Sequence, residues 1–504
     1  MRRRDFCQGS AALALLSSCA DRTLPKVPEH LSLSNALEQM RAGTLTAEGL
    51  LRHYLERISA LDKAGPELRS VIELHPAAEK VLVSLSRGPL HGAPVLIKDN
   101  IETADGMLTT AGSLALLNAP LPAKDAFLVR RLREAGAFIF GKTNLSEWAN
   151  IRSHDSTSGW SARGGLTRNP RRPTHTASGS SSGSAAAVAA GLCAAAIGTE
   201  TSGSIVSPAS ACGIVGLKPT LGAISRSGII PITRWQDTAG PMTRTVRDAA
   251  LLMDVLAAHD PEDDFSQEAP EPVREGFTSL FSPEALRGRR LGIARELCGQ
   301  HPGVLSAFDD TLKRLRQAGA EIVDDVEIPH HQAAGGLAWR AMLTEFRADL
   351  NDYLRKRGGQ VTSLAELIVF NRLHAEQEMP HFGQDLFVEA ERRASQLDLA
   401  EAKAARSRAG RLAGPEGMDL ALQQHRLDAL ICPTNDPAGR IDLAKGDANT
   451  RVACVPAAVA GYPHLTVPMS EVDGLPIGLS FMGPAWSEPL LLALGDAFEK
   501  LRQL

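Results

Sequence analysis

The sequence has few aromatic residues and no excess of positive charge. Phenylalanine, tryptophan and tyrosine make up 4% of its 504 residues, so we expect a core of closely packed aliphatic and small side chains. The chain has 54 lysine and arginine residues and 58 aspartate and glutamate residues, which gives a net charge of −4. It therefore lacks the excess of basic residues that is typical of nucleic-acid-binding proteins. Apolar residues at 43% and charged residues at 22% exclude a disordered chain.

Long hydrophobic runs and metal-binding patterns are also missing. The single membrane-like apolar run is short and lies at the extreme N-terminus, which excludes a bundle of transmembrane helices. Two of the seven cysteines fall in the first 19 residues, and the other five form no Cys-x-x-Cys pair, so neither a disulfide framework nor a zinc site is indicated. With no His-Glu-x-x-His pattern either, we expect no metal and no cofactor.

The first thirty residues are typical of an export signal and a tether. Consecutive arginines from Arg2 to Arg4 precede a short apolar segment and resemble a twin-arginine signal. Leu16-Ser17-Ser18-Cys19 resembles a lipoprotein cleavage box, in which Cys19 would carry the lipid; an ordinary cleaved signal is the alternative. We predict an export signal over residues 1–18, a tether over 19–30, and a protein that is periplasmic or lipid-anchored to the cell envelope.

The rest of the chain alternates between predicted strands and helices. Thr46 is a good N-cap for a helix that continues to about residue 61. Further helices are expected at 126–135, 312–318 and 489–501, and strands at 71–74, 93–97, 137–140, 321–323, 428–432, 464–467 and 477–481. This alternation predicts an α/β sandwich around a largely buried sheet. We also expect one long solvated helix over 387–411 and an exposed acidic connection over 260–272.

A serine- and glycine-rich segment from Ser178 to Ser184 is the most informative stretch. A phosphate-binding loop would need a lysine that this segment lacks. A flexible linker would be glycine- and serine-rich on both sides, whereas an alanine-rich apolar segment follows here directly. The third interpretation is a serine hydrolase, in which hydroxyl and backbone N–H groups gather on this segment and on a second one over 198–205.

A nucleophilic serine needs a base, and the sequence offers more than one. Ser181 lies at the centre of a Gly-x-Ser-x-Gly pattern, but no histidine partner stands out among the fourteen present. Lysine can act as the base where burial lowers its pKa. Lys98 and Lys142 both end apolar strands, and the residues alone do not choose between them.

Several motifs, in the same order along the chain, resemble the amidase signature family. They are Gly198-Thr199-Glu200-Thr201-Ser202-Gly203-Ser204-Ile205 and the segments 213–220, 237–242, 460–463 and 474–479. The resemblance runs from about residue 31 to the end and implies one amidase domain over 31–504. It implies an α/β/α sandwich with a mixed central β-sheet covered by helices on both faces.

The resemblance also implies a Ser–cis-Ser–Lys triad. Ser204 matches the nucleophile of the family, Ser180 matches the bridging serine after a cis peptide bond, and Lys98 matches the base, which leaves Lys142 a structural role. The backbone N–H groups of Thr201, Ser202, Gly203 and Ser204 would form the oxyanion hole.

The match has departures around the nucleophile. Val206 stands where the family usually has arginine, and Ser202 replaces one glycine of a frequent pair. Ser207-Pro208 is typical of an N-cap followed by the first helical residue.

Segments 141–150 and 158–165 and the turn containing Glu200 resemble bacterial peptide amidases. Such enzymes remove ammonia from the C-terminal amide of peptides. We therefore expect a small peptide or amide as substrate and no nucleic-acid partner, and interpret Trp148 and Trp160 as packing residues. A broader aliphatic or aryl amidase and a non-catalytic exported binding protein are the alternatives. A subunit that amidates misacylated tRNA would work in the cytoplasm, against the predicted export.

Overall fold

The computed structural model describes residues 27–78, 88–270, 276–393, 395–447 and 451–503. At its centre lies an 11-stranded sheet of strand order β1-β3-β2-β6-β8-β7-β12-β13-β11-β9-β10. Its strands are β1 (Val71–Leu74), β2 (Pro94–Lys98), β3 (Phe138–Thr143), β6 (Ala195–Glu200), β7 (Val215–Lys218), β8 (Thr238–Thr243), β9 (Arg290–Ile293), β10 (Glu321–Val323), β11 (Ala429–Pro433), β12 (His464–Val472) and β13 (Leu475–Met482). Strands β4 (Trp160–Ser161) and β5 (Gly165–Leu166) form a separate ribbon.

The sheet is mixed, which confirms the fold that the family resemblance implied. Strand β2 runs parallel to both β3 and β6, and β9 runs parallel to β10 and β11. The other neighbouring pairs of this sheet are antiparallel. All residues of β2, β3 and β6 are buried, as expected for strands covered on both faces.

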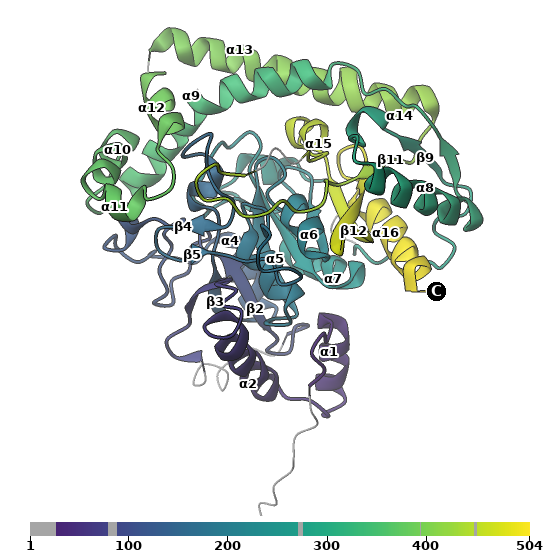
Figure 1. Cartoon of the computed structure of the whole chain (residues 1–504), viewed down its shortest axis with the longest axis horizontal. Coiled ribbons are helices and arrows are strands. Elements are labelled where there is room, and N and C mark those ends of the chain that lie inside the picture. Colours follow the sequence, from purple (N-terminus) through teal and green to yellow (C-terminus); the bar gives the residue numbers. More distant parts are fainter. Residues whose placement is uncertain (1–26, 79–87, 271–275, 394, 448–450, 504) are drawn as a thin grey trace, which may run out of the picture.

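Helices cover both faces of the sheet (Figure 1). Helix α7 contacts α1, α4 and α16, whereas α5 and α6 contact each other and the strands around the serine-rich segment. The bounds of these helices and of α2 and α8 are α1 (Leu33–Arg41), α2 (Ala47–Arg57), α4 (Phe127–Glu134), α5 (Ser182–Ala189), α6 (Val206–Cys212), α7 (Val246–Leu256), α8 (Pro302–Gln317) and α16 (Glu488–Gln503). Thr46 caps α2 through its side chain, as predicted.

Two long helices, α9 and α13, lie side by side across one end of the molecule, with α10 to α12 at their far end (Figure 1). The helices of this region are α9 (His331–Arg357), α10 (Leu364–Leu373), α11 (Ala375–Glu378), α12 (Asp385–Arg392), α13 (Gln396–Ala413), α14 (Asp419–His425) and α15 (Val455–Ala460). Apolar side chains of α9, α10 and α12 form a second core together with residues of the segments 111–116, 145–151 and 230–232. This core contains Phe346 and Phe387, whose rings stack.

The prediction of one helix over 387–411 is wrong. Helix α12 ends at Arg392, and α13 begins at Gln396 behind a capping box, in which Ser395 and Asp398 satisfy each other's backbone N–H groups. This arrangement supplies acceptors for N–H groups that a new helix start leaves free, so it stabilises the break.

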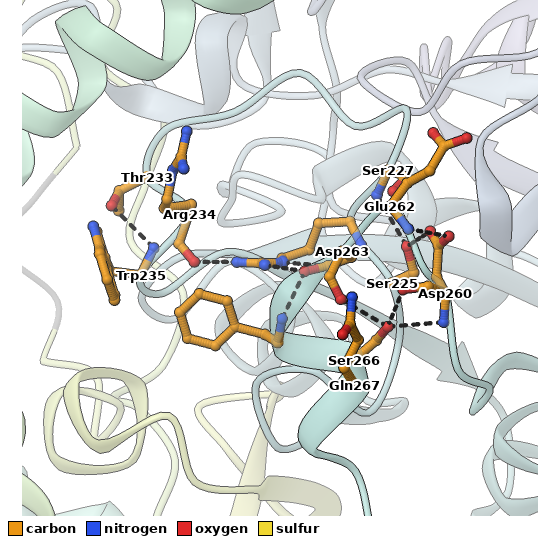
Figure 2. A network of polar contacts seen from close by, with 12 residues as sticks. Ser225, Ser227, Thr233, Arg234, Trp235, Asp260, Glu262, Asp263, Ser266 and Gln267 are labelled. Atoms are coloured by element: carbon orange, nitrogen blue, oxygen red, sulfur yellow. Dashed lines mark hydrogen bonds and ion pairs between the residues drawn. The ribbon is translucent and has the colours of Figure 1, made fainter.

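The prediction of an exposed acidic connection over 260–272 is also wrong in part. Figure 2 shows the carboxylates of Asp260 and Asp263 turned toward the chain around Ser225. Ser225 Oγ donates to Asp260 Oδ2 at 2.5 Å, Arg226 Nε donates to Asp263 Oδ2 at 2.8 Å, and both carboxylates are buried. Asp260 and Asp263 therefore hold a neighbouring loop, whereas Glu262 and Asp264 are exposed as the charge pattern suggested.

The predicted export signal over 1–18 and the lipid-bearing Cys19 lie outside the described residues and stay predictions. Within the described ranges, no helix combines the length and the apolar character needed to cross a bilayer.

Candidate active site

Lys98 lies at the end of β2 with its whole side chain buried. Its Nζ donates to Ser180 Oγ at 2.7 Å and to Thr199 Oγ1 at 2.9 Å. Burial lowers the pKa of Lys98 to about 7, although the charges of Asp237 and Glu200 act in the opposite direction. A lysine with this pKa is substantially neutral at physiological pH, so its amine can accept a proton from the hydroxyl beside it.

Ser180 follows a cis peptide bond from Gly179, as the resemblance implied. Its carbonyl oxygen accepts a hydrogen bond from the Ser146 N–H at 3.0 Å. A Cβ atom at position 179 would lie 2.2 Å from Ser146 Oγ, so the close approach of the two loops requires glycine there. The loop that carries Ser146 thus supports the serine that contacts Lys98.

Ser204 lies on the turn between β6 and α6 and is 8% exposed. Its carbonyl oxygen accepts a hydrogen bond from the Ser181 N–H at 3.1 Å, which joins the turn of Ser204 to the segment of Ser180. The three predicted triad residues therefore lie on adjoining segments, and the direct side-chain contact among them is that of Lys98 with Ser180.

Glu200 shapes the turn that carries Ser204. Its carboxylate accepts hydrogen bonds from the N–H groups of Gly203 at 2.7 Å, Ile205 at 2.7 Å and Val206 at 3.1 Å. Helix α6 begins at Val206, so the prediction that Ser207 is the N-cap is wrong. Glu200 lies five positions before the N-cap residue Ile205, outside the usual N-cap patterns, so local capping rules could not have identified this role.

The four N–H groups predicted for the oxyanion hole divide into two kinds. That of Gly203 is bonded to Glu200. Those of Thr201, Ser202 and Ser204 donate to no other residue within the described ranges. Of these three residues, Ser202 is exposed, whereas Thr201 and Ser204 are buried.

Lys142 and Ser181, the other base and the other serine that the sequence left open, make hydrogen bonds with other residues. Lys142 Nζ donates to Ile101 O at 2.5 Å and to Thr109 Oγ1 at 2.9 Å, away from the serine-rich segment. Ser181 Oγ donates to Thr199 O and accepts from Thr199 N–H, and its side chain is fully buried. Both residues therefore brace the strands around the site.

Two neighbouring residues of the site region received no role from the sequence: Asp237, which begins the motif 237–242, and Gln236 before it. Asp237 accepts hydrogen bonds from Thr201 Oγ1 at 2.6 Å and from two backbone N–H groups, while burial raises its pKa to about 6. Gln236 Nε2 donates to Thr201 O at 3.1 Å. No local pattern could have linked these residues to a turn some 35 positions earlier.

Trp148 and Trp160 are buried, which agrees with their interpretation as packing residues. Trp148 meets the ring of Phe387 edge-on, and Trp160 does the same with Phe382. The guanidinium of the buried Arg152 lies 4.1 Å from the Phe382 ring centroid. These contacts join the loop behind Ser146 to the region of α11 and α12.

Comparison with known proteins shows the family. Residues 50–492 match the family model described as Amidase. The crystal structure of native peptide amidase from Stenotrophomonas maltophilia superposes with a TM-score of 0.89 at 48% identity, over 94% of this chain and 98% of that one. A probable amidase of Arabidopsis thaliana is 38% identical over 97% of this chain and 94% of its own length. A glutamyl-tRNA(Gln) amidotransferase subunit from Chloroflexus aurantiacus is 36% identical, over 94% of this chain and 97% of its own length. The chain therefore belongs to the amidase family, the amidase signature family that its motifs resemble.

Proposed function

We propose that this amidase-family enzyme is a serine amidohydrolase that converts C-terminal peptide amides to the acid and ammonia through an acyl-enzyme on Ser204. The observation that carries the proposal is the buried contact of 2.7 Å between Lys98 Nζ and Ser180 Oγ. A buried lysine with a lowered pKa, which among the described residues has no carboxylate in direct contact, is suited to accept a proton from a serine.

The proposed proton transfers begin at that contact, and the transfer between Ser180 and Ser204 follows the family resemblance. Neutral Lys98 takes the proton of Ser180, Ser180 takes the proton of Ser204, and Ser204 Oγ forms a bond to the amide carbon. The resulting oxyanion accepts hydrogen bonds from the N–H groups of the Ser204 turn that Glu200 does not hold, each such donor being worth ~3 kcal/mol. The proton returns through Ser180 to the nitrogen, the C–N bond breaks and ammonia leaves. Water then hydrolyses the ester by the same route and releases the acid.

Similarity to peptide amidase supports the choice of substrate. The 48% identity to peptide amidase from Stenotrophomonas maltophilia spans nearly the whole of both chains. A broader aliphatic or aryl amidase uses the same chemistry with other acyl groups and is the alternative. A non-catalytic binding protein is the second alternative, and it would release no ammonia from any amide.

Ammonia release from a panel of amides tests the proposal. We expect the wild type to hydrolyse peptide amides faster than free amino-acid, aryl or fatty amides. Ser204→Ala should lower kcat/KM by roughly 10⁴-fold or more, since the nucleophile is lost. Ser487→Ala, the same change on the loop before α16, is the control and should leave the rate unchanged. A Ser204→Ala enzyme of near wild-type activity would show that the nucleophile is assigned wrongly.

A further inference from the structure

The loop of residues 225–237 contacts the turn of residues 201–205, which we call the nucleophile turn, and is itself held in place by other segments. Figure 2 shows its first part against the segment that carries Asp260 and Asp263. Its later part is anchored to α9, because the Arg234 N–H donates to Asp349 Oδ2 at 2.9 Å and Thr233 Oγ1 donates to Glu345 Oε2 at 2.7 Å. The loop is therefore held on two sides before it reaches Gln236.

Gln236 bridges the nucleophile turn and the long helix α13. Its Nε2 donates to Thr201 O at 3.1 Å, its Oε1 accepts from Arg406 Nη1, and the residue is 3% exposed. Arg406 is itself held by Glu345, with Nε and Nη2 donating to the two carboxylate oxygens at 2.9 and 2.7 Å. Both polar atoms of the amide are therefore engaged, and its orientation is defined.

The hydrogen bond to Thr201 O has a consequence for the next N–H group. The C=O of Thr201 and the N–H of Ser202 belong to one planar trans peptide unit and point in opposite directions. A donor that holds the carbonyl oxygen on one side thus directs the N–H to the other side. Glu200 accepts a hydrogen bond from the next N–H group, that of Gly203. The backbone on both sides of Ser202 is therefore held, by Gln236 at Thr201 O and by Glu200 at the Gly203 N–H.

We propose that Gln236, supported by Arg406, is a positioning residue that directs the Ser202 N–H toward the oxyanion formed at Ser204. The inference rests on the proposed function and adds to it a residue that does not touch the substrate. Helix α13, which the charge pattern alone placed on a solvated face, contributes to the site through the buried Arg406 side chain.

Two substitutions at Gln236 separate the two hydrogen bonds. Gln236→Glu keeps an acceptor for Arg406 and removes the donor to Thr201 O, whereas Gln236→Met removes both. At pH 8 we expect both variants to lower kcat by roughly 10- to 100-fold, because a mispositioned donor loses much of the effect of a deleted one. KM should change by less than about threefold. Arg411→Ala, on the same helix at an exposed ion pair, is the control and should behave as the wild type.

Binding of two ligands supplies a readout that folding alone does not change. A peptide aldehyde forms a tetrahedral adduct with an oxyanion at Ser204, and the corresponding peptide acid does not. We expect Kd for the aldehyde to rise about as much as kcat falls, and Kd for the acid to stay within about threefold.

Three results would overturn the inference but not the proposed function. Equal weakening of aldehyde and acid would show a general structural role. A normal rate in Gln236→Glu together with a low rate in Gln236→Met would show that Gln236 acts only as a partner of Arg406. A normal rate in both would show no role. A wild type that releases no ammonia and binds no aldehyde would instead refute the proposed function, and the inference with it.

Discussion

Two buried lysines at the ends of neighbouring strands have different surroundings. Lys98 ends β2 and lies opposite Thr143 of β3, while Lys142 lies opposite Ile97. Because side chains alternate between the two faces of a strand, the two amines point to opposite faces of the sheet. Thr143 Oγ1 is 2.7 Å from Ser184 Oγ of α5, which places the serine-rich segment on the Lys98 face.

The difference between these lysines teaches that burial alone does not identify a base. Burial lowers the pKa of Lys98 to about 7 and that of Lys142 to about 8, so both amines lose protons near neutral pH. Lys98 donates to a serine hydroxyl, a group that can pass on a proton. Lys142 donates to Ile101 O and to the hydroxyl of Thr109, and this hydroxyl in turn donates to the same Ile101 O at 3.3 Å. The partner of the amine therefore decides its role.

The largest expected effect separates the two lysines by activity. Lys98→Met should lower kcat/KM for a peptide amide by roughly 10³- to 10⁵-fold, because the base is removed from the triad. Lys142→Met should cost less than about tenfold, equivalent to ~1.4 kcal/mol in the barrier. Steady-state ammonia release from both purified variants, compared at equal folded fraction, gives the two ratios. Similar losses in both variants would contradict the assignment of Lys98 as the base.

The pH dependence of the rate gives a second comparison. Lys98 must be neutral to act, so with a pKa of about 7 we expect kcat/KM to fall about tenfold per pH unit well below pH 7 and to level off above it. Lys142→Met should keep this acid limb at the same pH. The check is a profile of kcat/KM from pH 5 to 9. If the acid limb disappeared in Lys142→Met, Lys142 would be the base. A flat wild-type profile would contradict a lysine base with this pKa.

The smallest effect concerns stability as a function of pH. Since the folded pKa of Lys142 is about 8 and the unfolded value is near 10.4, the unfolded chain binds more protons between these values, and the free energy of unfolding rises with pH there. The contribution of each such lysine is at most about 1.4 kcal/mol per pH unit. Lys142→Met should reduce the slope from pH 8 upward, and Lys98→Met from pH 7 upward. Urea unfolding at pH 7, 8 and 9.5 measures the slopes, and unchanged slopes would mean that neither amine is shifted in the folded state.

Local patterns predicted the elements well where the signal is short-range. Thr46 begins α2, and the apolar runs before Lys98 and Lys142 form β2 and β3, as expected. The prediction of a single helix over 387–411 failed because it followed composition and overlooked the cap at Ser395. The acidic connection failed for a different reason, since the basic partner of Asp263 is Arg226, a residue far outside any local window.

By itself, the sequence predicted strands β1 to β3 and β10 to β13, but not β6 to β9. It also identified the two serine-bearing segments and the short list of lysines that could serve them. These features depend on periodicity, capping residues and motif spacing, which are local properties of the chain. The residues alone left two lysines open, the family resemblance implied Lys98, and the tertiary structure shows that Lys98 contacts Ser180. Only the tertiary structure decided that two distant side chains, Gln236 and Arg406, support the turn of Ser204. Those contacts depend on which face of the sheet each loop covers, and this is set by the packing of segments that lie far apart in the chain.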